Sequence, residues 1–170
     1  MVEDHDHEYR VGIGTDIHRL AEGRKLMLGG VLVPYPAGLL GHSDGDVALH
    51  AVIDALLGAA GLGDIGTHFP DTDPKLKDAD SKALVLATRD KLTEQRWVIV
   101  NVDLIIHIEK PRLEPLKGQI KRAIASLLSI DFNAVNVKAK TNEGLGPVGE
   151  EKAIAATAAV LIKRKYKRTL

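Results

Sequence analysis

The chain has 170 residues, of which 45% are apolar and 27% charged, with a formal net charge of zero and no cysteine. These values are typical of one globular domain with a hydrophobic core; they do not favour a nucleic-acid or membrane-surface binder, and they exclude disulfides and thiolate metal sites. No apolar run approaches the roughly 20 residues that span a membrane. The absence of cysteine fits a cytoplasmic protein, which we expect here. The acidic start MVEDHDHEYR lacks the apolar core of a signal peptide.

The first half of the chain predicts a strand, a hairpin and a long helix. VGIGTDIHRL, residues 11–20, is typical of a strand, and the Gly-Gly pair within KLMLGGVLVP, residues 25–34, indicates a hairpin. SDGDVALHAVIDALLGAAGLG, residues 43–63, has a helical pattern. Ser43 is the candidate cap of this helix, with Asp46 three residues later, and Gly61 and Gly63 are its stop signals.

The second half alternates between helical and strand patterns. DIGTHFPDTDPKLKDAD, residues 64–80, is rich in Asp, Pro and Gly and indicates a loop. The following segments predict a helix over 81–95, a strand over 97–108, a helix over 113–130, a strand over 134–141 and a last helix over 150–167.

We therefore expect an α/β (α+β) fold: a single layer of mixed four-stranded sheet with helices on one face, plus a small β-hairpin. A single domain is expected over residues 11–163, between a flexible tail of residues 1–10 and a basic tail of residues 164–170.

GTDIHRL, residues 14–20, places a carboxylate and an imidazole two positions apart on the first strand. Because successive strand side chains alternate between faces, Asp16 and His18 point the same way. The pair is either a turn residue beside a surface histidine or one half of a metal site.

The first helix carries a second polar set. Asp46, His50 and Asp54 follow one another at i, i+4 spacing and form one stripe on an otherwise apolar helix. One interpretation is a buried histidine held by two aspartates. The other is that His50 joins Asp16 and His18 in a three-ligand site with an open fourth position, the pattern of catalytic zinc. Asp54 is then either a partner of the imidazole N–H or a helix-packing residue.

Two segments beside this helix are suited to binding phosphate or hydroxyl groups. His42 and Ser43 lie at the helix entrance, where backbone N–H groups favour a phosphate. Asp64 and Asp71 flank a loop dense in aspartate, which either binds a metal, binds sugar hydroxyls or only turns the chain. Phe69 in the same loop is most simply an anchor that packs on the core.

The stretch KAKTNEGLGP, residues 138–147, ends a predicted strand with polar residues. Thr141 offers a hydroxyl and an N–H for phosphate, and Glu143 could hold a hard cation such as Mg²⁺. A polar turn after the strand is the simpler interpretation of this stretch taken alone.

Together these segments resemble the 2-C-methyl-D-erythritol 2,4-cyclodiphosphate synthase family of the non-mevalonate isoprenoid pathway. The matching stretches are GIGTDIHRL, GHSDGDVALHAVIDALLGAAGLGDIGTHFPDTDP, EKPRL and VNVKAKTNEGLG, which follow the family's order. The combination of HSDGDVALH, LGDIG and FPDTDP is highly specific, and the resemblance covers the chain from about Val11 to Lys163.

The resemblance implies a cyclising, CMP-releasing phosphorus–oxygen lyase. Its substrate would be the nucleotide-linked 4-diphosphocytidyl-2-C-methyl-D-erythritol 2-phosphate, and its product 2-C-methyl-D-erythritol 2,4-cyclodiphosphate. The family also implies a homotrimer with active sites at subunit interfaces, and no nucleic-acid or membrane partner. Two metal ions are implied: Zn²⁺ on Asp16, His18 and His50, and Mg²⁺ or Mn²⁺ on Glu143.

The resemblance further assigns the substrate contacts residue by residue. His42 and Ser43 contact phosphate, while Asp64 and Asp71 hold methylerythritol hydroxyls. The catalytic candidates are Asp64, Thr141 and Glu143. The remaining substrate-binding candidates, some of which border cytosine and ribose, are Asp16, His18, Ile65, Gly66, Phe69, Ile108, Lys110, Pro111, Arg112, Leu113 and Lys140.

The sequence departs from the family pattern after Gly149, where GEEKAI stands in place of the expected Gly-Arg pair. In relatives that arginine lines a cavity on the trimer axis that can hold isoprenoid diphosphates. Glu150 disfavours an anion there unless Lys152 restores the pair, and Pro147 replaces the usual aromatic residue.

Two other functions fit the same residues. A zinc-dependent phosphohydrolase would use Asp16, His18 and His50 to activate water, with Asp64 as general base. A non-catalytic nucleotide-binding trimer would keep the fold alone. Product identity separates the enzymes, because the cyclase forms a cyclic diphosphate plus CMP and the hydrolase a linear phosphate.

Overall fold

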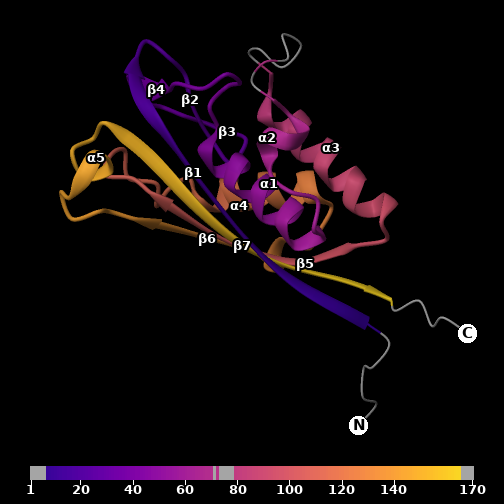
Figure 1. Cartoon of the computed structure of the whole chain (residues 1–170). Helices are drawn as coiled ribbons and strands as arrows, with labels where there is room; N and C mark the ends of the chain where they lie inside the picture. The colour runs from indigo at the N-terminus through magenta and orange to yellow at the C-terminus, as the bar shows by residue number, and fades with distance from the viewer. Residues whose placement is uncertain (1–6, 71, 73–78, 166–170) are drawn as a thin grey trace, which may run out of the picture.

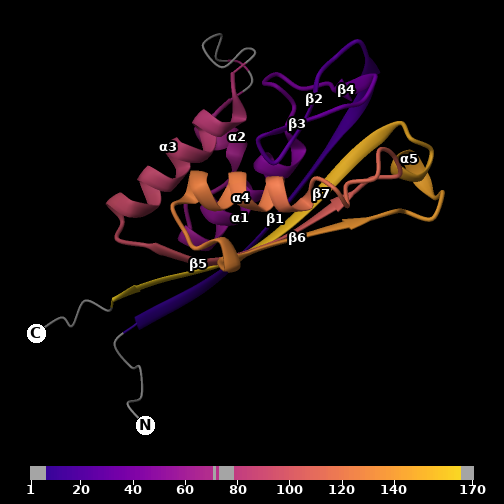
Figure 2. The ribbon, with the colours of Figure 1, turned by 180° about the vertical axis from the view of Figure 1, so that it is seen from behind.

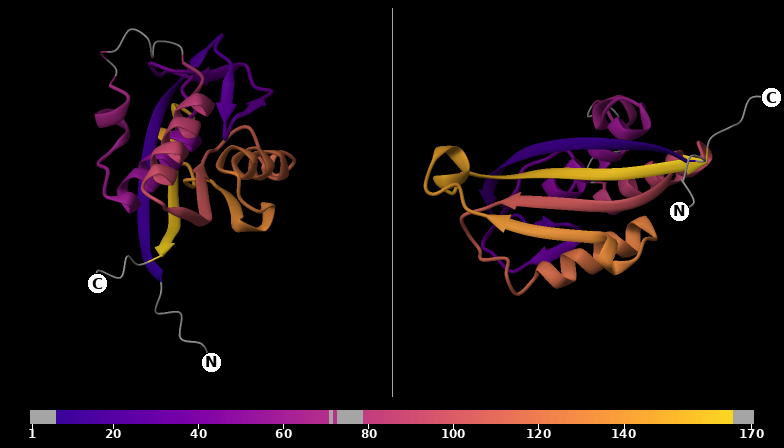
Figure 3. Two further views of the ribbon diagram at one scale, coloured as in Figure 1. Left: turned by 90° about the vertical axis from the view of Figure 1, so that its right-hand side faces the viewer. Right: turned by 90° about the horizontal axis from the view of Figure 1, so that it is seen from below.

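A five-stranded mixed sheet runs through the computed structural model, which describes residues 7–70, 72 and 79–165. The strand order is β4–β1–β7–β5–β6, with bounds Ala37–Leu39, His7–Glu22, Ala153–Lys165, Val98–His107 and Val135–Lys140. β5 and β6 are parallel, and the other neighbouring pairs are antiparallel. Figure 3 shows β1, β7, β5 and β6 side by side in this order. A separate hairpin pairs β2 (Leu26–Leu28) with β3 (Val31–Val33), as predicted from the Gly-Gly pair.

The long helices gather on one side of the sheet, which confirms the predicted architecture (Figures 1 and 2). They are α1 (Val47–Ala60), α3 (Ser81–Glu94) and α4 (Lys117–Leu128). Shorter elements are α2 (Ile65–His68), a 3₁₀ turn (Phe132–Ala134) and α5 (Gly146–Gly149). Among the described residues, no helix combines the length and apolarity needed to cross a membrane.

Two glycines of β1 bring α1 directly onto the strand. A Cβ atom on Gly12 would overlap the Ala55 carbonyl oxygen, and one on Gly14 would overlap the Ala51 carbonyl oxygen. The alternation of strand side chains places Gly12 and Gly14 on the same face as Asp16 and His18. The helix residue next to Ala51 is His50, so this close packing brings the His50 imidazole to the Asp16 and His18 side chains.

The predicted helix over 150–167 was wrong, because residues 153–165 form strand β7. Alanine favours helices, but this preference is weak and tertiary packing overrides it. β7 lies between β1 and β5, and Ala156 and Ala158 are buried on its helix-facing side. Alternate burial along β7, rather than a helical period, reveals the strand. Small side chains at these positions let α1 pack closely against the centre of the sheet.

Other differences concern element boundaries. Strand β4 was not predicted; it adds a fifth strand by pairing with the end of β1. β1 begins at His7, four residues before the predicted start, and α2 lies within the predicted loop over 64–80. Helix α1 begins at Val47 and is capped by Asp46 rather than Ser43, whereas Gly61 ends it in the left-handed region, as predicted.

The Asp46 carboxylate joins α1 to the β2–β3 hairpin. It is fully buried and accepts hydrogen bonds from the backbone N–H groups of Leu49, Gly29 and Gly30 at 3.0, 2.8 and 2.6 Å. Burial raises the pKa of Asp46, and the three N–H donors work against that rise. This carboxylate therefore fixes the hairpin against the amino end of the helix that carries His50.

The face of the sheet opposite the helices is open and apolar along β1. Val11 and Ile13 are each 69% exposed and Ile17 is 54% exposed, and all three lie on the face away from α1. Their partners across the β1–β7 pair include Ala155 and Ala159. Several large apolar side chains on one sheet face are typical of a surface that another protein covers.

Candidate metal centre

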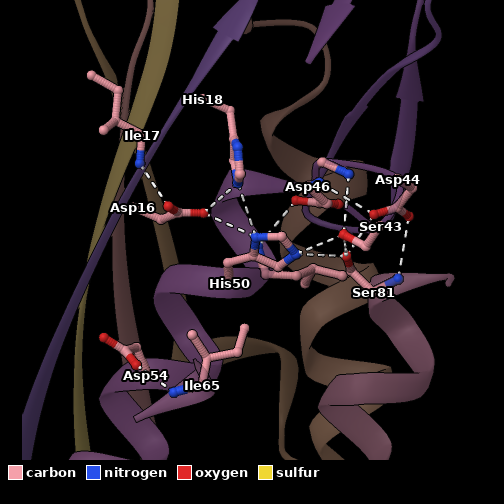
Figure 4. Close-up of polar contacts among 12 residues, drawn as sticks. Asp16, Ile17, His18, Ser43, Asp44, Asp46, His50, Asp54, Ile65 and Ser81 are labelled. Atoms are coloured by element: carbon pink, nitrogen blue, oxygen red, sulfur yellow. Dashed lines mark hydrogen bonds and ion pairs between the residues drawn. The ribbon is translucent and has the colours of Figure 1, made fainter. Parts of the chain in front are cut away.

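Three side chains converge where β1 passes the first turns of α1 (Figure 4). The Asp16 carboxylate oxygen Oδ2 lies 2.8 Å from His18 Nε2 and 2.9 Å from His50 Nδ1. The two imidazole nitrogens are 3.1 Å apart. Asp16 and His18 come from β1 and His50 comes from α1, so the fold brings together residues more than thirty positions apart.

The geometry of this cluster fits a metal ion. Aspartate and histidine bind zinc at about 2.0–2.2 Å, so tetrahedral ligand atoms lie roughly 3.3 Å from one another. The three atoms of the cluster need to separate by only a few tenths of an ångström to reach that spacing. All three residues are half-buried, and as a set they are the one group of three or more potential metal ligands found among the described residues.

Electrostatics keep the Asp16 carboxylate ionised. Burial alone would raise the pKa of Asp16, but hydrogen bonds and charge interactions with His18 and His50 outweigh burial, so that the pKa lies well below its usual range. A metal ligand must be deprotonated, so Asp16 is in the form that binds a cation.

A cavity of about 370 Å³ opens beside the cluster. Its size is within the range of small-molecule sites. The three residues of the metal cluster form part of its wall. Five other residues predicted to bind substrate also line it: His42, Ser43, Ile65, Gly66 and Phe69. The rest of the wall is formed by Thr15, Asp54, Pro70 and Leu84. Ser43 is 7% exposed and its hydroxyl lies 3.1 Å from His50 Nε2, so it borders both the cavity and the cluster.

The three residues of the polar stripe, Asp46, His50 and Asp54, make three different kinds of contact. Asp46 caps the helix and binds the hairpin, whereas His50 joins the metal cluster. Asp54 accepts a hydrogen bond from the Ile65 backbone N–H at 2.9 Å, which supports the alternative of a packing residue. The Nε2 atom of His50 lies 2.9 Å from the Ser81 hydroxyl instead.

The sequence interpretation missed Ser81 and its neighbour Asp44. Ser81 is the first residue of α3 and fully buried, and its hydroxyl donates a hydrogen bond to Asp44 Oδ1 at 2.5 Å. A serine at a helix start usually indicates capping, so its type and position carried no signal for a contact with His50.

Asp64 lies at the amino end of α2, beside the cavity. Its Oδ1 accepts hydrogen bonds from the backbone N–H and the hydroxyl of Thr67, and these bonds lower the pKa of Asp64. Asp71 lies outside the described residues.

The predicted nucleotide-binding segments lie at the opposite edge of the sheet. They follow the parallel strands β5 and β6, whose ends are joined by a hydrogen bond from the Ile108 N–H to the Lys140 carbonyl. Glu109 links the segments by accepting a hydrogen bond from the Asn142 N–H at 2.6 Å. Lys140 ends β6, and the segments that follow the two strands contain Ile108, Lys110, Pro111, Arg112, Leu113, Thr141 and Glu143.

Within one chain the two sets of residues are apart. β7 and β5 separate β1 from β6, and neighbouring strands lie about 4.8 Å apart, so the two strands are roughly 14 Å from each other. None of the nucleotide-segment residues lines the cavity at the metal cluster. Glu143 accepts a hydrogen bond from the Thr141 hydroxyl at 2.7 Å and is exposed.

Comparison with known proteins gives consistent matches along most of the chain. The YgbB family model matches residues 9–163. The chain is 56% identical over 155 residues to 2-C-methyl-D-erythritol 2,4-cyclodiphosphate synthase of Neisseria gonorrhoeae, covering 91% of this chain and 97% of the relative. The synthase of Chlorobaculum tepidum is 55% identical over 154 residues, covering 91% of this chain and 98% of the relative.

Solved structures also match over most of this chain. The bifunctional IspDF from Campylobacter jejuni superposes with a TM-score of 0.90 at 41% identity, and the match covers 93% of this chain but only 43% of that longer protein. A 2C-methyl-D-erythritol-2,4-cyclodiphosphate synthase with bound CDP superposes with a TM-score of 0.83 at 38% identity, covering 90% of this chain and 99% of the other. The IspF–CDP complex of Plasmodium falciparum has a TM-score of 0.81 at 35% identity, covering 93% and 97%.

Proposed function

The chain belongs to the YgbB family of 2-C-methyl-D-erythritol 2,4-cyclodiphosphate synthases, and from this premise we propose how its residues perform the reaction. It is a cyclising lyase of isoprenoid precursor biosynthesis, which converts 4-diphosphocytidyl-2-C-methyl-D-erythritol 2-phosphate to the cyclodiphosphate and releases CMP. The observation that carries the mechanism is the convergence of Asp16, His18 and His50 on one point beside a substrate-sized cavity. A cytoplasmic location stays a prediction from composition.

We assign Zn²⁺ to Asp16, His18 and His50, and Mg²⁺ or Mn²⁺ to Glu143. Divalent cations at these places would supply Lewis-acid charge neutralisation at the phosphates. The chemistry needs this help because the attacking 2-phosphate and the β-phosphate that it attacks are both anionic. Phosphoryl transfer otherwise demands mainly positioning from a protein.

We assign that positioning to residues of the cavity wall and of the segment that follows α1 in the sequence. His42 and Ser43 lie at the cavity wall before α1, where they meet the phosphate groups. Asp64 and Asp71 bind the methylerythritol hydroxyls and hold the substrate in a folded conformation. Ring closure within one oriented molecule saves roughly 7–11 kcal/mol of the barrier. The substrate's 2-phosphate is ionised near neutral pH, so no strong general base is required.

CMP is the leaving group, and the segments after β5 and β6 bind it. The backbone of Ile108 to Leu113 borders cytosine and ribose, while Lys140 and Thr141 lie at the α-phosphate. Lys110 forms an ion pair with Glu151 at 2.8 Å, which raises the pKa of Lys110 and keeps it cationic. Two of the solved relatives are complexes with CDP.

The metal cluster lies on β1 and α1, and the nucleotide segments follow β5 and β6, so the two are separated across the strand order of the sheet. We therefore propose that two subunits complete each active site. A homotrimer joins the cavity of one chain to the nucleotide segments of its neighbour. The open apolar face of β1 supports this arrangement, since an assembly would bury Val11, Ile13 and Ile17.

Ile13→Arg tests the assembly. A cation at the centre of the apolar β1 face should prevent association, because burying an unpaired charge costs several kcal/mol. We expect light scattering to show trimers for the original chain and monomers for the variant, with activity at least about 100-fold lower because each site loses its nucleotide half. Leu86→Arg is the matched control: this exposed leucine lies on α3, on the helix side, and should leave mass and activity unchanged. An Ile13→Arg trimer with full activity would contradict the proposed interface.

Asp64→Asn separates substrate positioning from metal binding. Asparagine keeps an acceptor oxygen for Thr67, so α2 retains its cap, but it binds the methylerythritol hydroxyls less strongly. Misplacing a reacting group by 1 Å can cost about 100-fold in rate, and we expect a fall in kcat of that order. Metal analysis should find zinc content unchanged. A large loss of zinc from this variant would refute the assignment.

Product analysis distinguishes the cyclase from a zinc-dependent phosphohydrolase and from a non-catalytic nucleotide-binding trimer. We expect ³¹P NMR of the reaction to show a cyclic diphosphate together with CMP in equal amounts. A linear phosphate product would favour the hydrolase, and an unchanged substrate spectrum in the presence of zinc and magnesium would favour the binding protein.

A further inference from the structure

Helix α3 contributes a partly buried hydrogen-bond chain to the metal cluster. His50 Nε2 lies 2.9 Å from the Ser81 hydroxyl, which donates to Asp44 Oδ1 at 2.5 Å (Figure 4). Asp44 Oδ2 also accepts from the Ser81 backbone N–H at 3.3 Å. The carboxylate thus holds both the hydroxyl and the backbone of Ser81.

The hydrogen-bond donors and acceptors along this chain place a proton on Nε2 of His50. A serine hydroxyl has one proton, and a carboxylate can only accept, so the Ser81 proton is directed to Asp44. The Ser81 oxygen can then only accept from His50, which requires a proton on Nε2. Nδ1 faces Asp16 and His18, and with the Nε2 proton held by Ser81 it is the nitrogen that loses its proton and presents a lone pair when a cation binds between the three side chains.

Ser43 offers a second, weaker contact to the same N–H. Its hydroxyl lies 3.1 Å from His50 Nε2 and 3.3 Å from the Ser81 hydroxyl, and it accepts from the Gly45 N–H. Among the described residues, the contacts of the Ser43 hydroxyl are with His50, Ser81 and the Gly45 N–H rather than with a carboxylate, so the direction of its proton is not fixed in the same way. Ser81 is also the more enclosed group, being fully buried, whereas Ser43 lines the cavity.

We propose that Ser81 and Asp44 are positioning residues, which select the Nδ1 lone pair of His50 as a metal ligand and hold its ring toward Asp16 and His18. The inference rests on the metal site of the proposed function and extends it to α3, an element that contributes no metal ligand. Outer hydrogen-bond partners of ligating histidines typically change metal affinity by about 10–100-fold. Neither residue touches substrate in this role.

Zinc affinity of the full chain, measured by competition with a chromogenic chelator, tests the proposal. We expect Ser81→Ala to bind zinc about 10–100-fold more weakly than the original chain. Asp44→Asn should have a smaller effect, because the amide oxygen still accepts from Ser81. Asp80→Ala is the matched control: Asp80 caps the same end of α3 through the Lys82 N–H without a recorded contact to His50, so zinc affinity should be unchanged.

A second measurement identifies the role as positioning rather than general support of the fold. In zinc-loaded, ¹⁵N-histidine-labelled protein, the Nε2 proton of His50 should exchange slowly in the original chain and rapidly in Ser81→Ala. Unchanged zinc affinity and unchanged proton exchange in Ser81→Ala would overturn the inference while leaving the metal site intact. By contrast, failure of the original chain to bind zinc, with His50→Gln no different, would overturn the proposed metal centre itself.

Discussion

Replacing Gly14 with alanine is expected to destabilise the protein and to weaken its metal site at the same time. The new Cβ atom would lie 2.5 Å from the Ala55 nitrogen and 2.9 Å from the Asp54 Cβ, and it would overlap the Ala51 carbonyl. These are backbone atoms and a Cβ atom of α1, which cannot turn aside as the end of a flexible side chain can, so the whole helix must move. Overpacking of this kind typically costs about 1–3 kcal/mol, and we expect the upper end of that range. Displacement of α1 also moves His50 away from Asp16.

Gly58→Ala provides a control of opposite sign on the same helix. A Cβ atom there would meet nothing within 4 Å, and the position is exposed. Alanine favours a helix interior over glycine by about 0.5–1 kcal/mol, so this variant should gain stability.

Chemical unfolding in the presence of a chelator, at one protein concentration, measures both Gly14→Ala and Gly58→Ala without the contribution of bound metal. A Gly14→Ala variant as stable as the original chain would mean that α1 does not rest on β1 as described.

Periodicity and spacing predicted the elements wherever local sequence and tertiary environment agree. The hairpin follows from its Gly-Gly pair, and α1, α3 and β5 follow from long runs of clear period. β7 was misassigned because it is rich in alanine, which favours helices. Its alanines instead meet the need for small side chains beneath α1, and this need arises only once the sheet and the helix are packed together. The conflict between local preference and packing is greatest at the centre of the sheet, where side chains must be small.

In the candidate site too, the residues placed by local sequence were predictable, and those placed by tertiary packing were not. Asp16 and His18 lie two residues apart on one strand, so their shared face was predictable, and His50 stood out as the one imidazole within the long apolar helix pattern. Ser81 and Asp44 could not be found in this way, since their function depends on α3 docking beside α1. Asp54 has the spacing of a partner to His50, but helix spacing does not determine which way a side chain turns, and it binds the Ile65 N–H instead.

Removing any one ligand of the metal cluster should have the largest effect on activity. Asp16→Asn loses the anionic oxygen, and His18→Gln loses one imidazole nitrogen, in a set whose ligand atoms lie 2.8–3.1 Å apart. A metal ion contributes several kcal/mol of charge stabilisation to such reactions, and each 1.36 kcal/mol is tenfold in rate. We therefore expect each variant to lose at least about 100-fold in kcat/KM together with its tightly bound zinc, whereas the exposed Asp90→Asn on α3 should lose neither.

The double variant Asp16→Asn/His18→Gln shows whether these side chains act through one ion. If a shared zinc is lost on the first substitution, the second removes a side chain that no longer has a metal to bind, and the activity of the double variant should equal that of the weaker single variant. Strong non-additivity of this kind is characteristic of residues that function as a unit. Losses that multiply would instead mean that Asp16 and His18 contribute independently, and the three side chains would then be neighbours on β1 and α1 without being a metal centre.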